Sequence, residues 1–166
     1  MVNFSPHQQH LAQEIRTTLR PFRLTLAVTA GAYSSGDVVG GRLKLGGLGV
    51  PPGFWLNRIV ISDKAAQSVD YRLIIFDAAP TVIADNAAIS TLADADAAKV
   101  IFDRTLDAAT YRLHVTNSSW HIMDGMDEAL VADPTGGVDL YAYLVAVTAP
   151  TYASGSDVSL YLVGTG

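Results

Sequence analysis

Cysteine is absent from the 166-residue chain, which excludes disulfide bonds and thiolate metal sites. No apolar run reaches the roughly 18 residues that a membrane-spanning helix needs, because Asp, Arg, Gly or Pro interrupts each candidate. The first ten residues lack the basic and apolar segments of a secretory signal, so we expect none. Yet 49% of the residues are hydrophobic and the mean hydropathy is +0.26. We therefore expect the surplus apolar surface to be buried against other subunits.

Basic residues are scarce in most of the chain, which has a net charge of -5. Residues 1–23 are the exception. This segment contains Arg16, Arg20 and Arg23 but only one acidic residue, Glu14, so its net charge is +2. The remainder carries 8 basic and 15 acidic residues, so we expect it to repel nucleic acid. The basic segment could lie on an acidic protein surface, or it could be a solvated helix.

A helix is predicted over residues 6–20. Ser5 and Gln8 have the spacing of a capping box, and Pro6 suits the first helical position. Pro21 ends the helix because a proline pushes the preceding residue out of the helical region. The narrow apolar stripe of this helix consists of Leu11, Ile15 and Leu19. Such a segment could pack on its own domain or reach a neighbouring subunit.

From Phe22 onward the apolar residues follow the period of two that is typical of half-buried strands. Residues 22–28 alternate in this way, and the glycine-rich residues 37–49 indicate a strand pair or a bulged strand with Leu43 and Leu45 facing inward. A short helix is predicted over 92–100, capped by Asp94 or Asp96. Further strands are predicted at 55–62, 70–77, 110–116, around 120–123, at 138–147 and at 156–164.

Short strands separated by turns predict an all-β fold, an antiparallel β-sandwich with jelly-roll topology. The strands are too closely spaced for the crossovers that a parallel sheet requires. We therefore expect an N-terminal helical arm over 1–21 and a β-sandwich domain over 22–166, with one short internal helix.

Catalytic and metal-binding patterns are weak. His7 and His10 with Glu14 could form a poor metal site, and the carboxylates around Asp124–Glu128 a loose calcium site, but neither spacing matches an established motif. We interpret His114 as a structural histidine in a strand. Nucleophile-elbow and phosphate-loop motifs are missing as well. The sequence predicts no catalytic, cofactor or metal site, and hence not an enzyme.

Several short phrases recur as a set in a family of small tailed-bacteriophage and prophage virion proteins, which this sequence resembles over about two-thirds of its length. The phrases are Ile61-Ser-Asp63-Lys64, Phe76-Asp77-Ala-Ala-Pro80-Thr81, Asp85-Asn86-Ala-Ala, Asp94-Ala-Asp96-Ala-Ala-Lys99 and Pro150-Thr-Tyr152-Ala-Ser-Gly-Ser-Asp157. The resemblance implies a head-associated structural role, such as a capsid decoration or cement protein. It brings no catalytic residues, and residues 1–21 lie outside it.

These observations predict a protein made in the bacterial host cytoplasm that binds the outer capsid surface and bridges major capsid proteins, with neither membrane nor nucleic acid as a partner. Self-association, as in a homotrimer, would hide surplus apolar surface. The predicted capsid contacts are Leu11, Ile15, Arg16, Leu19, Arg20 and Arg23, followed by the loops 31–36, 46–53 and 118–127.

Two alternatives stay open at this point. The first is a receptor- or carbohydrate-binding module on the virion, with a stacking platform formed by Tyr33, Trp55, Trp120 and His121. The second is a tail or connector protein.

Overall fold

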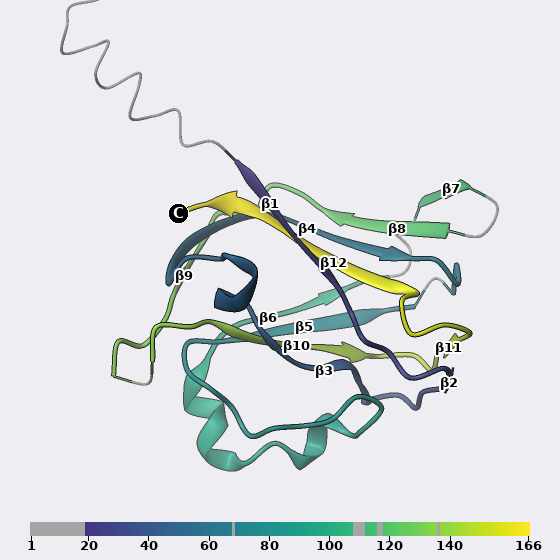
Figure 1. Cartoon of the computed structure of the whole chain (residues 1–166), viewed down its shortest axis with the longest axis horizontal. Helices are drawn as coiled ribbons and strands as arrows, with labels where there is room; N and C mark the ends of the chain where they lie inside the picture. Colours follow the sequence, from purple (N-terminus) through teal and green to yellow (C-terminus); the bar gives the residue numbers. More distant parts are fainter. Residues whose placement is uncertain (1–18, 68, 108–111, 116–117, 136) are drawn as a thin grey trace, which may run out of the picture.

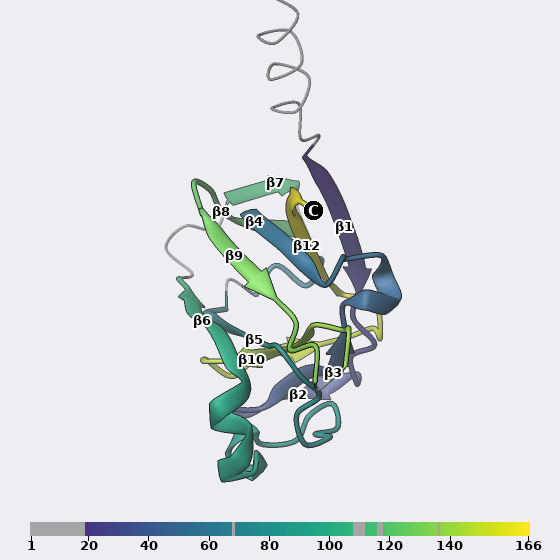
Figure 2. The same cartoon turned by 90° about the vertical axis from the view of Figure 1, so that its left-hand side faces the viewer.

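The computed structural model describes residues 19–67, 69–107, 112–115, 118–135 and 137–166. Two antiparallel sheets pack face to face, as the views in Figures 1 and 2 show. The six-stranded sheet has the order β1-β12-β4-β8-β7, with β9 also paired to β4. The four-stranded sheet has the order β3-β10-β5-β6. The prediction of an all-β antiparallel sandwich is therefore confirmed.

The strands have the following bounds. The six-stranded sheet consists of β1 (Arg20–Thr25), β12 (Val158–Thr165), β4 (Gly53–Asp63), β8 (Ser118–Met123), β7 (Arg112–Val115) and β9 (Glu128–Val131). The four-stranded sheet consists of β3 (Val38–Lys44), β10 (Tyr141–Ala146), β5 (Tyr71–Phe76) and β6 (Val100–Leu106). A small ribbon pairs β2 (Gly31–Ala32) with β11 (Thr151–Tyr152), and three 3-10 helices are η1 (Gly46–Leu48), η2 (Ile89–Thr91) and η3 (Asp94–Lys99).

Strands that are distant in the chain lie side by side in both sheets, for example β1 beside β12 and β3 beside β10. This order is compatible with the jelly-roll topology, which stays a prediction. Contacts between residues far apart in sequence dominate such a fold, because almost every strand pairs with one from another part of the chain.

The main core lies between the sheets and follows from the alternation of side chains along each strand. On β4, Leu56, Ile59 and Ile61 point inward and are fully buried. On β1, Phe22 and Leu24 pack against the same core, as predicted. Each such side chain contributes about 1.5–3 kcal/mol of hydrophobic stabilisation.

Strand β3 has the bulge that its glycines predict. Its pairing with β10 shifts between Val39 and Leu43, and the intervening Gly40 and Gly41 have φ of +83° and +70°, a left-handed region that favours glycine. Leu43 and Leu45 are buried, as expected.

The chain start differs from the prediction. Strand β1 begins at Arg20, so the helix predicted to residue 20 does not extend that far, and Pro21 lies inside a strand. An edge strand accepts proline because one side of it needs no backbone donors, and β1 is at the sheet edge. Residues 1–18, which hold the rest of the predicted arm, lie outside the described residues.

A second apolar cluster lies on the outer face of the four-stranded sheet. Residues 77–99, with η2 and η3, run across this face, below the sheets in Figure 1. Ile83 from this covering segment is buried against side chains of the sheet, including Phe76 and Tyr143. Consequently β5 and β10 are buried on both faces, which explains their continuous apolar sequences.

Three polar side chains hold the covering segment in place. The Tyr143 hydroxyl donates to the Thr81 carbonyl and accepts the Ile83 N–H. Asp96, only 2% exposed, accepts the Thr81 N–H at 2.9 Å, and its other oxygen accepts Lys99 Nζ at 2.7 Å. Lys99 Nζ also donates to the Ala79 carbonyl at 2.8 Å.

The predicted short helix is therefore present, but its capping was predicted wrongly. Ala93 occupies the N-cap position without a side-chain bond, whereas Asp94 and Asp96 lie in the first turn. Asp96 accepts bonds from a different loop instead, because burial leaves its carboxylate no water to accept from.

We predict that Asp96→Asn lowers the free energy of unfolding by about 1–3 kcal/mol at pH 7, because Asn has no charge and one acceptor oxygen instead of two, so that one of the bonds from Thr81 and Lys99 is lost. Burial raises the pKa of Asp96, but hydrogen bonds from Lys99 and Thr81 outweigh burial and lower this pKa to about 2. The stabilisation should therefore be present above the unfolded-state pKa of about 3.9 and be lost as the pH falls toward 2. Urea denaturation at pH 7 and pH 3 measures this difference.

The control is Asp94→Asn, which changes an exposed carboxylate in the same 3-10 helix. We expect Asp94→Asn to have little effect on stability. Equal losses in the two variants, or a loss in Asp96→Asn that does not shrink in acid, would contradict the assigned role.

Candidate interaction surface

The outer face of the six-stranded sheet is formed by the side chains that alternate with the core residues. The cross-strand register places Arg23 beside Tyr161 and Tyr161 beside Val60. Val60 is in turn opposite Ile122, and Ser62 opposite Trp120. Aromatic, aliphatic and basic side chains thus form one continuous row across the sheet.

This face differs from that of the opposite sheet, because no described segment crosses it (Figures 1 and 2). Trp120 is 42% exposed, and Val60, Ile122 and Tyr161 are half-buried. Large exposed apolar side chains in a row, outside the core, mark interaction surfaces in folded proteins.

A hollow of about 160 Å³ lies on this face between β8, β4 and β12. Its lining residues are Arg58, Val60, Trp120, Tyr161 and Val163. The volume is of the order of one large side chain or one sugar ring. Aromatic and arginine side chains around a small apolar hollow are the combination that dominates binding energy in protein interfaces.

Two guanidinium groups border the hollow. Arg58 forms an ion pair with Asp124, which is exposed on the loop after β8. The Arg23 guanidinium carbon lies 5.3 Å from the centroid of the Tyr161 ring, within the range of a cation–π contact. Both arginines are therefore held on the face, where they remain exposed to a partner.

The four residues of the predicted stacking platform do not share one surface. Tyr33 and His121 are 3% and 1% exposed, so neither can stack on an external ligand. Trp55 and Trp120 are exposed, both on the outer side of the six-stranded sheet, and Trp55 Nε1 donates to Asp127. The platform prediction is thus wrong for two residues. Strand alternation turns His121 of β8 toward the interior, and Tyr33 is buried in the loop that follows β2.

Tyr33 has a structural role. Its hydroxyl donates to Asp85 at 2.7 Å and accepts the Thr29 N–H at 2.8 Å, and Asp85 also accepts the Gly40 N–H. Burial raises the pKa of Asp85, but the bonds from Thr29, Tyr33 and Gly40 outweigh it and lower this pKa. A carboxylate that stays ionised here ties two loops to β3.

Four of the carboxylates in the phrases that carry the family resemblance behave alike. Asp63 accepts the N–H groups of Ala65 and Gln67, and Asp157 accepts those of Ala153 and Ser154. Together with Asp85 and Asp96 they satisfy backbone donors in turns, which is structural chemistry. The acidic residues of these phrases therefore stabilise loop conformations.

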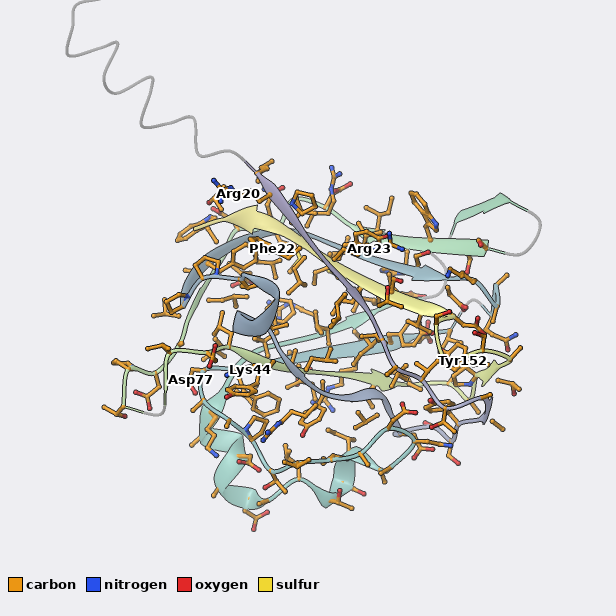
Figure 3. The ribbon with its side chains drawn as sticks, viewed as in Figure 1. Arg20, Phe22, Arg23, Lys44, Asp77 and Tyr152 are labelled. Carbon is orange, nitrogen blue, oxygen red and sulfur yellow. The ribbon has the colours of Figure 1, made fainter. Side chains whose placement is uncertain are left out.

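The predicted capsid contacts are distributed as follows. Leu11, Ile15 and Arg16 lie outside the described residues. Leu19 is 52% exposed just before β1, while Arg20 is exposed where β1 begins and Arg23 lies along it, as Figure 3 shows. Tyr152 lies at the opposite end of the sandwich in that view.

Val60, Tyr161 and Val163 were not among the contact residues predicted from the sequence. Their signal was present, since each alternates with core residues on a predicted strand and is apolar where a polar residue is usual. Only the order of the strands in the sheet shows that these three side chains lie next to one another.

Among the described residues, no three His, Asp or Glu side chains come close enough to hold a metal ion. In the segment predicted as a loose calcium site, the acidic side chains already bond to Arg58, Trp55 and Arg104. No helix in the described part of the chain is long and apolar enough to cross a membrane.

We predict that His121 is neutral at pH 7 and that its burial makes the fold sensitive to acid. Burial lowers the pKa of His121, although a bond with the Asp107 backbone and the nearby carboxylates of Asp107 and Asp70 oppose this. Because the unfolded chain binds the proton first, the free energy of unfolding should fall as the pH drops below about 6.5.

An NMR titration of the His121 imidazole should give a pKa below 6.5, and His121→Gln should reduce the loss of stability between pH 7 and pH 5. A pKa at or above 6.5 would contradict this prediction.

No family model and no curated protein matches this chain. Among solved structures, the chain is similar to one described as "Israeli acute paralysis virus heated to 63 degree - full particle", with a TM-score of 0.29 and 11% sequence identity. The match covers 99% of this chain and 79% of that chain. A TM-score this low does not establish a shared fold.

Proposed function

We propose that the protein is a structural component of a tailed-phage virion, a decoration protein that packs on the major capsid protein through the outer face of its six-stranded sheet. The observation that supports this most directly is the exposed hollow with Trp120 and Tyr161 on a sheet face that no described segment covers. The family resemblance of the sequence supports the virion setting.

The chemistry of the face favours a protein partner. Burial of Trp120 and Tyr161 in a well-packed interface would supply hydrophobic binding free energy. Arg20 and Arg23 on the edge strand β1 would add contacts to acidic groups of the partner. Many copies on a symmetric shell would bind it with avidity, and binding only the assembled shell would stabilise that shell by mass action. The proposed role includes no catalytic step.

We predict that Trp120→Ser weakens co-sedimentation of the full-length protein with empty capsids of its phage by about 30-fold. This corresponds to the loss of about 2 kcal/mol that is typical of an aromatic side chain at the centre of an interface. The measurement is the bound fraction as a function of protein concentration.

Val82→Ser is the matched control, since Val82 is 68% exposed but belongs to the covering segment on the opposite sheet. The control should bind like the unchanged protein. Unchanged binding by Trp120→Ser, or no capsid binding by the unchanged protein, would contradict the proposal.

A second candidate uses the same hollow, since Trp120 and Tyr161 are flat aromatic side chains flanking a space of about one sugar ring. A carbohydrate-binding role would give hits on a glycan array that Trp120→Ser abolishes. A tail or connector position would instead give a dozen or fewer copies per virion, whereas a decoration protein gives hundreds.

A further inference from the structure

The loop between β8 and β9 contains the one Asp-Gly step of the sequence, Asp124–Gly125, and the sequence has no Asn-Gly step. A backbone nitrogen that follows an aspartate can attack the side-chain carboxyl. Glycine shields its nitrogen least, because it has no Cβ. The attack closes a five-membered ring within the chain, so the two reacting atoms are already held close together. The step is therefore a candidate for a spontaneous change of the backbone.

Both reacting groups are accessible in the structure. The Asp124 side chain is 58% exposed. A Cβ built on Gly125 would meet no other atom within 4 Å, so open space surrounds this backbone position. Among the described residues, the Gly125 N–H has no hydrogen-bond partner. The nitrogen can therefore approach the carboxyl without breaking an existing bond of its own.

The residues on either side of the step are held by β4. Met123 is the last residue of β8 and pairs with that strand. The Met126 N–H donates to the Asn57 carbonyl at 3.0 Å. Only Asp124 and Gly125 lie between these two attachments, so a ring that closes within the step leaves the pairing of β4 with β8 and β9 in place. The reaction does not require the sheet to unfold.

The chemistry of the step needs water alone. The Gly125 nitrogen bonds to Cγ of Asp124, a C–O bond of the protonated carboxyl breaks, and one water leaves. The product is a neutral cyclic imide. Hydrolysis returns one water at either imide carbonyl. Attack at the side-chain carbonyl restores aspartate, whereas attack at the main-chain carbonyl leaves the chain running through Cγ as isoaspartate.

Arg58 opposes this reaction through its ion pair with Asp124. Ring closure removes the negative charge that Arg58 binds, so the ion pair stabilises the unreacted carboxylate. The effect is modest because both side chains are exposed. Isoaspartate has a main chain longer by one carbon and a carboxylate attached directly to Cα, so it cannot keep the same bond to Arg58. Because Arg58 lines the hollow on the outer face, the reaction would alter the polar border of that hollow.

We infer that Asp124–Gly125 isomerises spontaneously to isoaspartate and that Arg58 slows this reaction. The inference assigns a modification site whose co-reactant is water. It does not depend on the capsid-binding function.

Prolonged incubation of the full-length chain at pH 7, in water enriched in heavy oxygen, tests the site. Peptide mapping by mass spectrometry should find isoaspartate with heavy oxygen at position 124. Asp94 is the internal comparison, since it is exposed but precedes Ala95, and it should remain almost unmodified. Isoaspartate at position 124 that does not exceed the level at Asp94 would overturn the inference.

Two arginine variants test the role of the ion pair. Arg58→Gln should accelerate the reaction about two- to fivefold, the range expected when an exposed ion pair is removed. Arg104→Gln is the matched control, since Arg104 is exposed and pairs with Glu128 nearby, and it should leave the rate unchanged. Equal rates in Arg58→Gln and the unchanged chain would refute the part assigned to Arg58.

Asp124→Glu tests the ring itself. This variant keeps a carboxylate for Arg58, but its longer side chain cannot close a five-membered ring. The isomerised product should therefore be lost. Isomerisation at position 124 at the unchanged rate in this variant would contradict the imide route.

Discussion

Burial of β5 and β10, the central strands of the four-stranded sheet, on both faces is the constraint on which the rest of the molecule depends. One face packs against the six-stranded sheet and the other against residues 77–99. Residues 77–99 therefore place many backbone N–H and C=O groups next to an apolar surface, and these groups need hydrogen-bond partners. Tyr143 and Asp96 meet that requirement by bonding to Thr81 and Ile83, since unpaired polar groups would be costly there.

The consequence is an asymmetric molecule. The chain covers one outer face with its own residues and leaves the other as a sheet surface with Trp120, Tyr161 and Val60. Apolar residues outside the main core thus lie in two places. Some form the second internal cluster, and others form the exposed row on the six-stranded sheet. The exposed row can be reached by a partner, whereas the internal cluster cannot contribute to association.

The two candidate binding sites have different geometry. The hollow around Trp120 is small and lies in the middle of the face, as an anchor position in an interface does. A groove of about 530 Å³, lined by Trp55, Val131 and Thr165 among others, is larger and lies at the end of the same sheet where β1 begins.

The sequence alone predicts the β class and the inward residues of 22–28, and it gives a bulged strand as one of two possibilities for 37–49, because alternation and left-handed glycines are local properties. It missed β6 and β9. Their apolar pattern is weak, and their partners β5 and β4 lie far away in sequence. Only the tertiary structure decided that Tyr33 and His121 are buried and that Trp120, Tyr161 and Val60 meet on one exposed face. The physical reason is that a strand's own residues set the period of its side chains, whereas its neighbours and the covering of each face depend on pairing between distant segments.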